Sequence, residues 1–155
     1  MATINATINV ASADITSSPL ALSNTMTMTK AGTTTGLEFT SGLVRRKLTA
    51  TTAIDLVTVG AQMYGTPTSA GANKLYIKNT GSSSVDYIDI AIGDKDADAG
   101  EELLATGGNS KITLGKLFGG DWMLIPFQGS ANNDIIVVPS TAEVTTIEWM
   151  LFFEE

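Results

Sequence analysis

The stretch KLYIKNTGSSSVDYIDIAIGD, Lys74–Asp94, decides the fold class of this chain. Along both of its halves, 74–79 and 85–92, apolar residues alternate with polar ones. Because successive side chains of a strand point to opposite faces of a sheet, the alternation predicts two strands, each with one buried face. The side chains predicted to be buried are Leu75, Ile77, Ile88, Ile90 and Ile92. The turn residues 80–84, TGSSS, separate the two strands, so the pattern predicts a hairpin.

The same period of two continues on both sides of this stretch. It predicts further strands at 3–10, 20–28, 43–51, 53–59, 111–114 and 144–153, and apolar runs bounded by turn residues predict strands at 122–127 and 134–138. About eight to ten short strands at regular spacing, without a long helical stripe, are typical of an all-β fold. We expect an antiparallel β-sandwich or jelly roll. It forms one domain at 19–155, preceded by an extended N-terminal arm at 1–18.

The composition agrees with this fold and excludes several kinds of chemistry. Of the 155 residues, 22 are Thr, 12 are Ser and 15 are Gly. The absence of Cys and His excludes disulfides, thiolate nucleophiles and His-based zinc, haem or general-base sites. Neither a P-loop nor a nucleophile-elbow motif is present. We therefore expect a protein that is not an enzyme, uses no cofactor and takes no small-molecule substrate.

Charge and hydropathy narrow the class of partner. The net charge of −7 argues against nucleic acid. Residues 1–80 carry six basic and three acidic groups, net +3, whereas residues 81–155 carry three basic and thirteen acidic groups, net −10. This asymmetry suits layered protein contacts, and chance is the alternative. The longest apolar run, 122–127, is too short to span a bilayer, and the N-terminus does not resemble a secretory signal, so we expect a soluble protein without a membrane partner.

Three late segments are apolar on both faces. WMLI at 122–125 and IIVV at 135–138 lack polar alternation, and in 144–153 Met150 and Phe152 lie opposite a second apolar face. A strand of this kind lies between two layers or under another subunit. Because one small sandwich cannot easily cover both faces of three strands, we expect a homo-oligomer. The alternative is that loops cover the second face.

The acidic stretch IGDKDADAGEE, 92–102, resembles a calcium loop. Asp94, Asp96 and Asp98 have the spacing of the first three ligands of an EF-hand. However, the glycine comes one position late and Ala105 stands where the bidentate carboxylate is required, so no EF-hand is expected. Two readings stay open, a looser calcium site that includes Glu101 and a solvated charged turn.

Two further groups of side chains are candidates for binding. Arg45, Arg46 and Lys47 form a basic cluster that pairs with an acidic partner surface or is ordinary solvated charge. A phosphate or nucleic-acid patch, the third alternative, would need more cations and interleaved aromatic residues. Tyr76 and Tyr87 are predicted on the outer face of adjacent strands. They either form a small glycan-binding platform or pack across the strands and stabilise the hairpin.

The second half of the chain resembles small virion proteins of tailed bacteriophages. The resemblance rests on KLYIKNTG, VDYIDIAIGD, ITLGKLFGGDWMLIPFQGSANNDIIVVPS and IEWMLFF, in that order, between residues 74 and 153. It covers about half of the chain and includes no catalytic signature. It implies a β-sandwich or jelly-roll capsid decoration (cement) protein, commonly a trimer. Such a protein clamps the major capsid protein on the outside of the head.

The resemblance thus implies two partners, further copies of the chain and the major capsid protein. It places the protein on the capsid surface of the virion after assembly in the host cytoplasm. The alternative is a tail or fibre module that binds a host glycan or receptor. The side chains expected at the oligomer contact are Trp122, Met123, Ile125, Phe127, Trp149, Met150 and Phe152. Those expected at the capsid contact are Ile4, Ile8, Arg45, Arg46 and Lys47.

Overall fold

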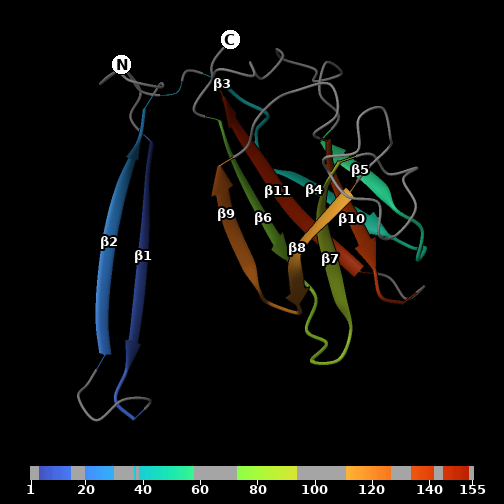
Figure 1. Ribbon diagram of the computed structural model, residues 1–155, viewed down its shortest axis with the longest axis horizontal. Coiled ribbons are helices and arrows are strands. Elements are labelled where there is room, and N and C mark those ends of the chain that lie inside the picture. The colour runs from blue at the N-terminus through green and yellow to red at the C-terminus, as the bar shows by residue number, and fades with distance from the viewer. Residues whose placement is uncertain are drawn as a thin grey trace.

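The fold is seen in a computed structural model that describes residues 4–14, 20–29, 37, 39–57, 73–93, 111–126, 134–141 and 145–153. Within these ranges the chain forms antiparallel strands and no helix, which confirms the predicted all-β class (Figure 1). The strands are β1 (Ile4–Ser12), β2 (Leu20–Met28), β3 (Phe39–Thr40), β4 (Val44–Leu48), β5 (Ile54–Val57), β6 (Lys74–Asn79), β7 (Tyr87–Gly93), β8 (Lys111–Phe118), β9 (Trp122–Pro126), β10 (Asp134–Pro139) and β11 (Thr145–Phe153).

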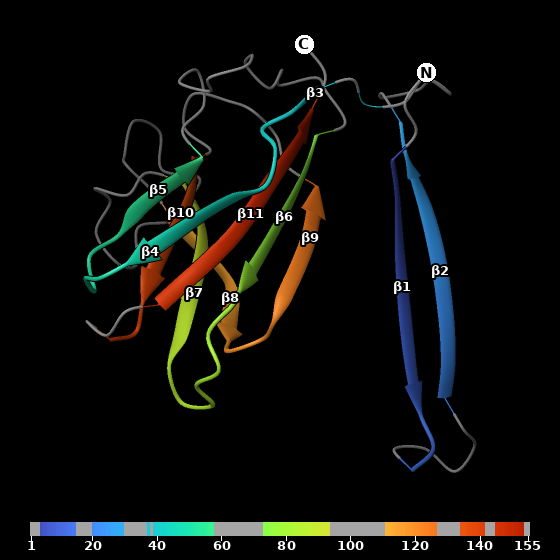
Figure 2. The ribbon, with the colours of Figure 1, turned by 180° about the vertical axis from the view of Figure 1, so that it is seen from behind.

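Three sheets organise these strands. One sheet has the order β5-β10-β7-β8, and a second has the order β3-β11-β6-β9, with β4 also paired to β11. The third is the two-stranded sheet β1-β2. The two larger sheets share one core and form a sandwich-like arrangement, which Figure 2 shows from behind. The connections β4–β5, β6–β7, β8–β9 and β10–β11 each pass from one of these sheets to the other.

The predicted hairpin between residues 74–79 and 85–92 is wrong. β6 pairs with β11 and β9, whereas β7 pairs with β10 and β8, so the two strands lie in different sheets. The connection 80–86 crosses between the sheets instead of turning within one. The physical reason is that this crossing directs the apolar faces of both strands to the same core, where Ile77 and Ile88 are fully buried.

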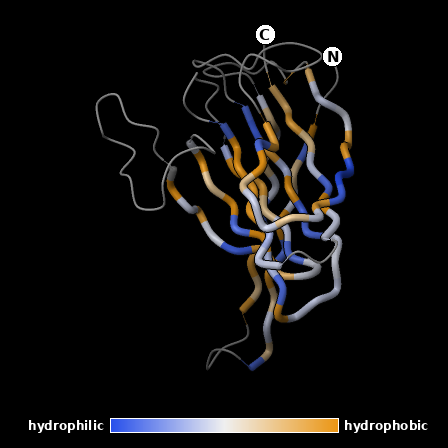
Figure 3. Tube along the Cα trace, turned by 90° about the vertical axis from the view of Figure 1, so that its right-hand side faces the viewer, coloured by the Kyte–Doolittle hydropathy of each residue, from blue (hydrophilic) through white to orange (hydrophobic). Residues whose placement is uncertain are grey.

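The core lies between the inner faces of the two larger sheets. Its fully buried members include Leu48, Val57, Leu75, Ile77, Ile88, Ile90, Ile135, Val137, Ile147 and Leu151. Apolar and polar residues alternate along the strand traces in Figure 3, which matches the period of two in the sequence. β10 lies between β5 and β7, and both of its faces are buried, with Ile135, Ile136 and Val137 at 0% exposure. For this strand the chain covers both apolar faces by itself.

The crossings β6–β7 and β8–β9 are bonded to each other. The side-chain amide of Asn79, 2% exposed, donates to the Leu117 carbonyl at 3.0 Å, and its oxygen accepts from the Gly81 amide at 2.9 Å. The Gly119 amide donates to the Ser83 carbonyl at 3.0 Å. Asn79 thereby joins the two sheets at this end of the sandwich.

Candidate interaction surface

The hairpin β1-β2 stands apart from the sandwich as a sheet of its own (Figures 1 and 2). Its register pairs Ile4 with Met28 and Ser12 with Leu20, so the segment expected as an arm forms one half of it. One face is a polar ladder, in which Thr7 bonds to Thr25 at 2.9 Å and Ser23 donates to Asn9 at 2.6 Å. Because side chains alternate, the other face carries mainly apolar side chains, interrupted by Asn24 and Ser12.

Most of this apolar face is in contact with solvent. Ile8, Val10, Leu20, Leu22 and Met26 are between 38% and 53% exposed. The face becomes covered only near its root, where Met28 is 3% exposed. An isolated two-stranded hairpin is marginal in water, and contiguous exposed apolar patches mark interaction sites. The hairpin is therefore the first candidate contact surface.

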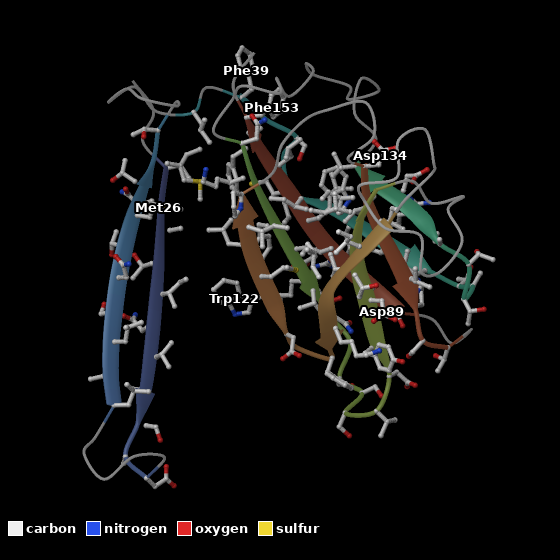
Figure 4. The ribbon with its side chains drawn as sticks, in the orientation of Figure 1. Met26, Phe39, Asp89, Trp122, Asp134 and Phe153 are labelled. Carbon is white, nitrogen blue, oxygen red and sulfur yellow. The ribbon has the colours of Figure 1, made fainter. Side chains whose placement is uncertain are left out.

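A second surface, the outer face of the β4-β11-β6-β9 sheet, lies opposite the root of the hairpin. A cavity of about 180 Å³ separates them. It is lined on the hairpin side by residues 4–8 and Met28, and on the sheet side by Tyr76, Trp122, Leu124 and Phe152. Trp122 is 48% exposed, and Figure 4 shows it projecting from β9 toward the hairpin. Two apolar surfaces thus oppose each other across a space that neither fills.

The aromatic part of this outer face is bordered by charge. The Tyr76 and Trp122 rings lie 6.3 Å apart and tilted by 38°. Burial raises the pKa of Tyr76, and the Glu148 carboxylate raises it further. Burial lowers the pKa of Lys74. Among the described residues the strand register puts four cations on this face, Arg45, Lys47, Lys74 and Lys78, against one anion, Glu148.

The residues expected at the oligomer contact separate into two groups. Trp149 is 8% exposed and belongs to the core, and Met123 and Ile125 pack against that core. This corrects their assignment to a partner, because inward-facing side chains cannot reach one. Met150, Phe152 and Trp122 do lie on the outer face. Phe127 is outside the described residues.

The residues expected at the capsid contact lie at three places. Ile4 and Ile8 lie on the apolar face of the hairpin. Arg45 and Lys47 point outward from β4, where Arg45 forms an ion pair with Glu148. Arg46 points the other way and donates to the Asp55 carbonyl at 3.3 Å.

Tyr76 and Tyr87 do not form a common platform, because their strands belong to different sheets and their rings lie on opposite outer faces. On the far face the Lys116 ammonium lies 3.5 Å from the centre of the Tyr87 ring, and Phe118 packs 5.4 Å from it. Tyr87 is the largest cause of the raised pKa of Lys116, and Asp89 raises this pKa further. With Lys116 on one side and Phe118 beside it, the Tyr87 ring is not a free platform for a sugar.

The remaining candidates give no further site within the described residues. Asp94, Asp96, Asp98 and Glu101 all fall outside them. In the described part of the chain no three acidic, His or Cys side chains gather where they could hold a metal. Nor does that part include a helix of the length and hydropathy needed to cross a membrane.

Comparison of this chain with protein-family models, with curated proteins and with solved structures finds no match in any of the three. Function must therefore be argued from the surfaces of this molecule.

Sequence reasoning missed one feature of the surface. β8 extends to Phe118 rather than ending at residue 114, and Ile112 and Leu114 on this strand are 42% and 44% exposed. The alternation in KITLGKLF is interrupted by a register shift between Ile90 and Ala91 on the paired strand β7. A β-bulge of this kind leaves little trace in a hydropathy pattern.

Proposed function

We propose that this protein is a structural virion protein, a capsid decoration (cement) protein that binds the outer surface of a phage head and stabilises it. The observation that carries the proposal is the hairpin, whose apolar face is largely uncovered by its own chain. A free apolar arm attached to a compact β-sandwich suits a protein whose work is adhesion. The sequence resemblance to phage virion proteins supports the same function.

We further propose that the sandwich is a jelly roll. Eight strands, β4 to β11, form two four-stranded orders, β4-β11-β6-β9 and β5-β10-β7-β8. Successive strands cross from one sheet to the other at β4–β5, β6–β7, β8–β9 and β10–β11. Two interlocked antiparallel sheets of this kind recur in viral capsid proteins and in lectins. The topology is compatible with both the cement function and its alternative.

The mechanism of such a protein is burial of surface. Each Å² of apolar area removed from water contributes about 25 cal/mol, so modest contacts suffice when many copies bind one shell. The cations of β4 supply the polar component. Arg45 and Lys47 face outward at the side of the sheet, where they can pair with acidic groups of the major capsid protein.

Co-expression with the major capsid protein from the same phage genome tests this function. We expect the chain to co-sediment with assembled shells in many copies per particle, and to raise the temperature at which the shells disrupt. A Lys47→Glu variant should bind less, whereas Lys116→Glu on the opposite face is the matched control and should bind normally. Absence of the chain from shells, or shells of unchanged thermal stability, would contradict the proposal.

One observation favours a second function, a tail or fibre module that binds a host glycan. Trp122 is 48% exposed beside Tyr76 on a grooved face, and exposed rings next to polar groups are typical of sugar sites. A glycan-binding module should lose affinity for host-cell polysaccharide on Trp122→Ala or Tyr76→Ala, with Phe118→Ala as the control. A cement protein should show no polysaccharide affinity to lose.

A further inference from the structure

We propose that the tip of the hairpin of one copy packs on the outer face of the β4-β11-β6-β9 sheet of a second copy, so that the chains close into a ring. This inference rests on the proposed function and names the first of its two partners. It assigns the exposed tip residues Val10, Leu20 and Leu22 to a neighbouring copy of the chain, whereas Ile4 and Ile8 line the cavity within one chain.

Within one chain, the apolar face of the hairpin already lies opposite the outer face of the sheet. Residues 4–8 and Met28 face Tyr76, Trp122, Leu124 and Phe152 across the cavity of about 180 Å³. The surfaces are of the same apolar kind, yet Trp122 stays 48% exposed. The intrachain contact is therefore incomplete on both sides.

The hairpin reaches beyond the part of its own sheet that it faces. The turn end of the hairpin extends away from the sandwich in Figures 1 and 2, and it carries Val10, Leu20 and Leu22 beyond the residues that line the cavity. These three side chains are 44%, 38% and 53% exposed. The hairpin can therefore bridge to an adjacent molecule.

The hairpin and the receiving face are also complementary in charge. Residues 4–28 carry one charged side chain, Asp14, close to the turn. The receiving face carries four cations against one anion among its described residues. An apolar hairpin with an acidic tip thus complements an apolar face with a basic border.

The surfaces involved fix the type of assembly. The hairpin and the sheet face are different patches of the chain, so the contact is head-to-tail, and a head-to-tail contact forms a closed ring when its rotation closes. Each copy then gives one hairpin and receives one. A trimer is the smallest ring larger than a reciprocal pair, and three chains of 16.2 kDa give about 49 kDa.

Disulfide trapping between two single-cysteine variants tests the contact directly, because the natural chain contains no Cys. Leu22→Cys protein is mixed with Lys78→Cys protein, which carries a mass tag, and the mixture is oxidised. A mixed disulfide then can form only between chains. We expect a yield several-fold higher than for the control mixture of Leu22→Cys with Leu114→Cys, whose cysteine is exposed on β8 outside the receiving face. Equal yields, or none, would overturn the inference.

Light scattering on the purified chain supplies the second measurement. We expect about 49 kDa for the natural chain and 16.2 kDa for the double variant Val10→Asp, Leu22→Asp. The control is Val85→Asp, a change at a 76% exposed residue of the β6–β7 connection, which should leave the assembly intact. If the double variant fails to fold, the disulfide yield alone decides.

The two proposals fail separately. If the natural chain is a monomer at every concentration and still co-sediments with shells, the ring is contradicted and the cement function stands. A ring that forms but does not bind shells would contradict the cement function and would leave the contact between copies supported.

Discussion

Gly119 shows how one residue sets the distance between two connections of the sandwich. A Cβ at this position would lie 2.6 Å from the Ser83 nitrogen and 2.7 Å from its carbonyl oxygen, closer than real contacts allow. Backbone cannot move aside as a flexible side chain can. We expect Gly119→Ala to lower the free energy of unfolding by about 1–3 kcal/mol, the range of overpacked sites.

Gly115→Ala is the matched control. A Cβ at Gly115 meets no atom within 4 Å, so this change should alter the stability by less than about 0.5 kcal/mol. Urea unfolding of both variants measures the difference. Equal effects at the two glycines would show that the Ser83 contact does not constrain the chain.

Asn79 is the buried polar residue that joins the sheets. Asn79→Ala leaves the Leu117 carbonyl and the Gly81 amide without their side-chain partner. An unsatisfied buried group costs about 1–3 kcal/mol, so we expect a loss of about 2–3 kcal/mol in the free energy of unfolding. Asn24→Ala on the exposed hairpin is the control and should leave the unfolding of the sandwich unchanged, as followed by Trp fluorescence.

Tyr76 predicts an alkaline loss of stability. Its pKa is raised above 10.0, so the native state holds the phenol proton more tightly than the unfolded chain does. The resulting stability is complete below the unfolded pKa and is lost as the pH rises through the native pKa. Tyr76→Phe has no such proton and should lose less stability between about pH 8 and about pH 11. Urea midpoints at both pH values measure this, and parallel losses in the two proteins would contradict it.

At the scale of elements, the sequence reveals strands better than it reveals their partners. Alternation predicts the strand at 74–79 and an apolar run predicts the strand at 134–138, each within one residue of β6 and β10. The same alternation could not show that β6 and β7 lie in different sheets, because a buried face looks alike whichever strand lies beside it. Trp122 and Trp149 illustrate the limit for the site. Both stand in apolar runs, but one is 48% and the other 8% exposed.

The strands of the hairpin can be predicted from the sequence, but the position of the hairpin in the fold cannot. Ile4, Ala6, Ile8 and Val10 alternate with polar residues as they would in any sheet, and they do share a face in β1. A period of two predicts that one face of a strand is apolar. It does not predict which surface covers that face, because this depends on the whole fold. The sequence also does not show that β8 and β9 are edge strands, because edge strands and central strands can share one hydropathy pattern.

Removal of the hairpin should separate its role from that of the sandwich. A chain without residues 2–29 keeps the core cluster, all of whose members belong to residues 48–153. We therefore expect its sandwich to unfold with a free energy within about 1 kcal/mol of the full chain under conditions where both are monomeric. The mass in light scattering should fall to that of one chain. Unfolding of the truncated protein at low urea would show that the hairpin belongs to the folding unit.

At the scale of the whole molecule, the two proposed contacts differ in their physics, and salt should separate them. The contact between copies buries apolar side chains of the hairpin and includes one charge of the hairpin, Asp14, whereas the contact with the shell uses Arg45 and Lys47 on a basic face of a chain with net charge −7. Ionic strength shortens the range of exposed charge pairs from about 10 Å at 0.1 M to about 3 Å at 1 M, and it does not weaken apolar burial. We expect shell binding to fall steeply between these salt concentrations while the mass of the free oligomer stays constant. Sedimentation with shells and light scattering without them measure the two responses on the same protein. Complete dissociation of the oligomer at about 1 M salt would show that charge rather than apolar burial holds the copies together, and the hairpin contact would then no longer account for the assembly.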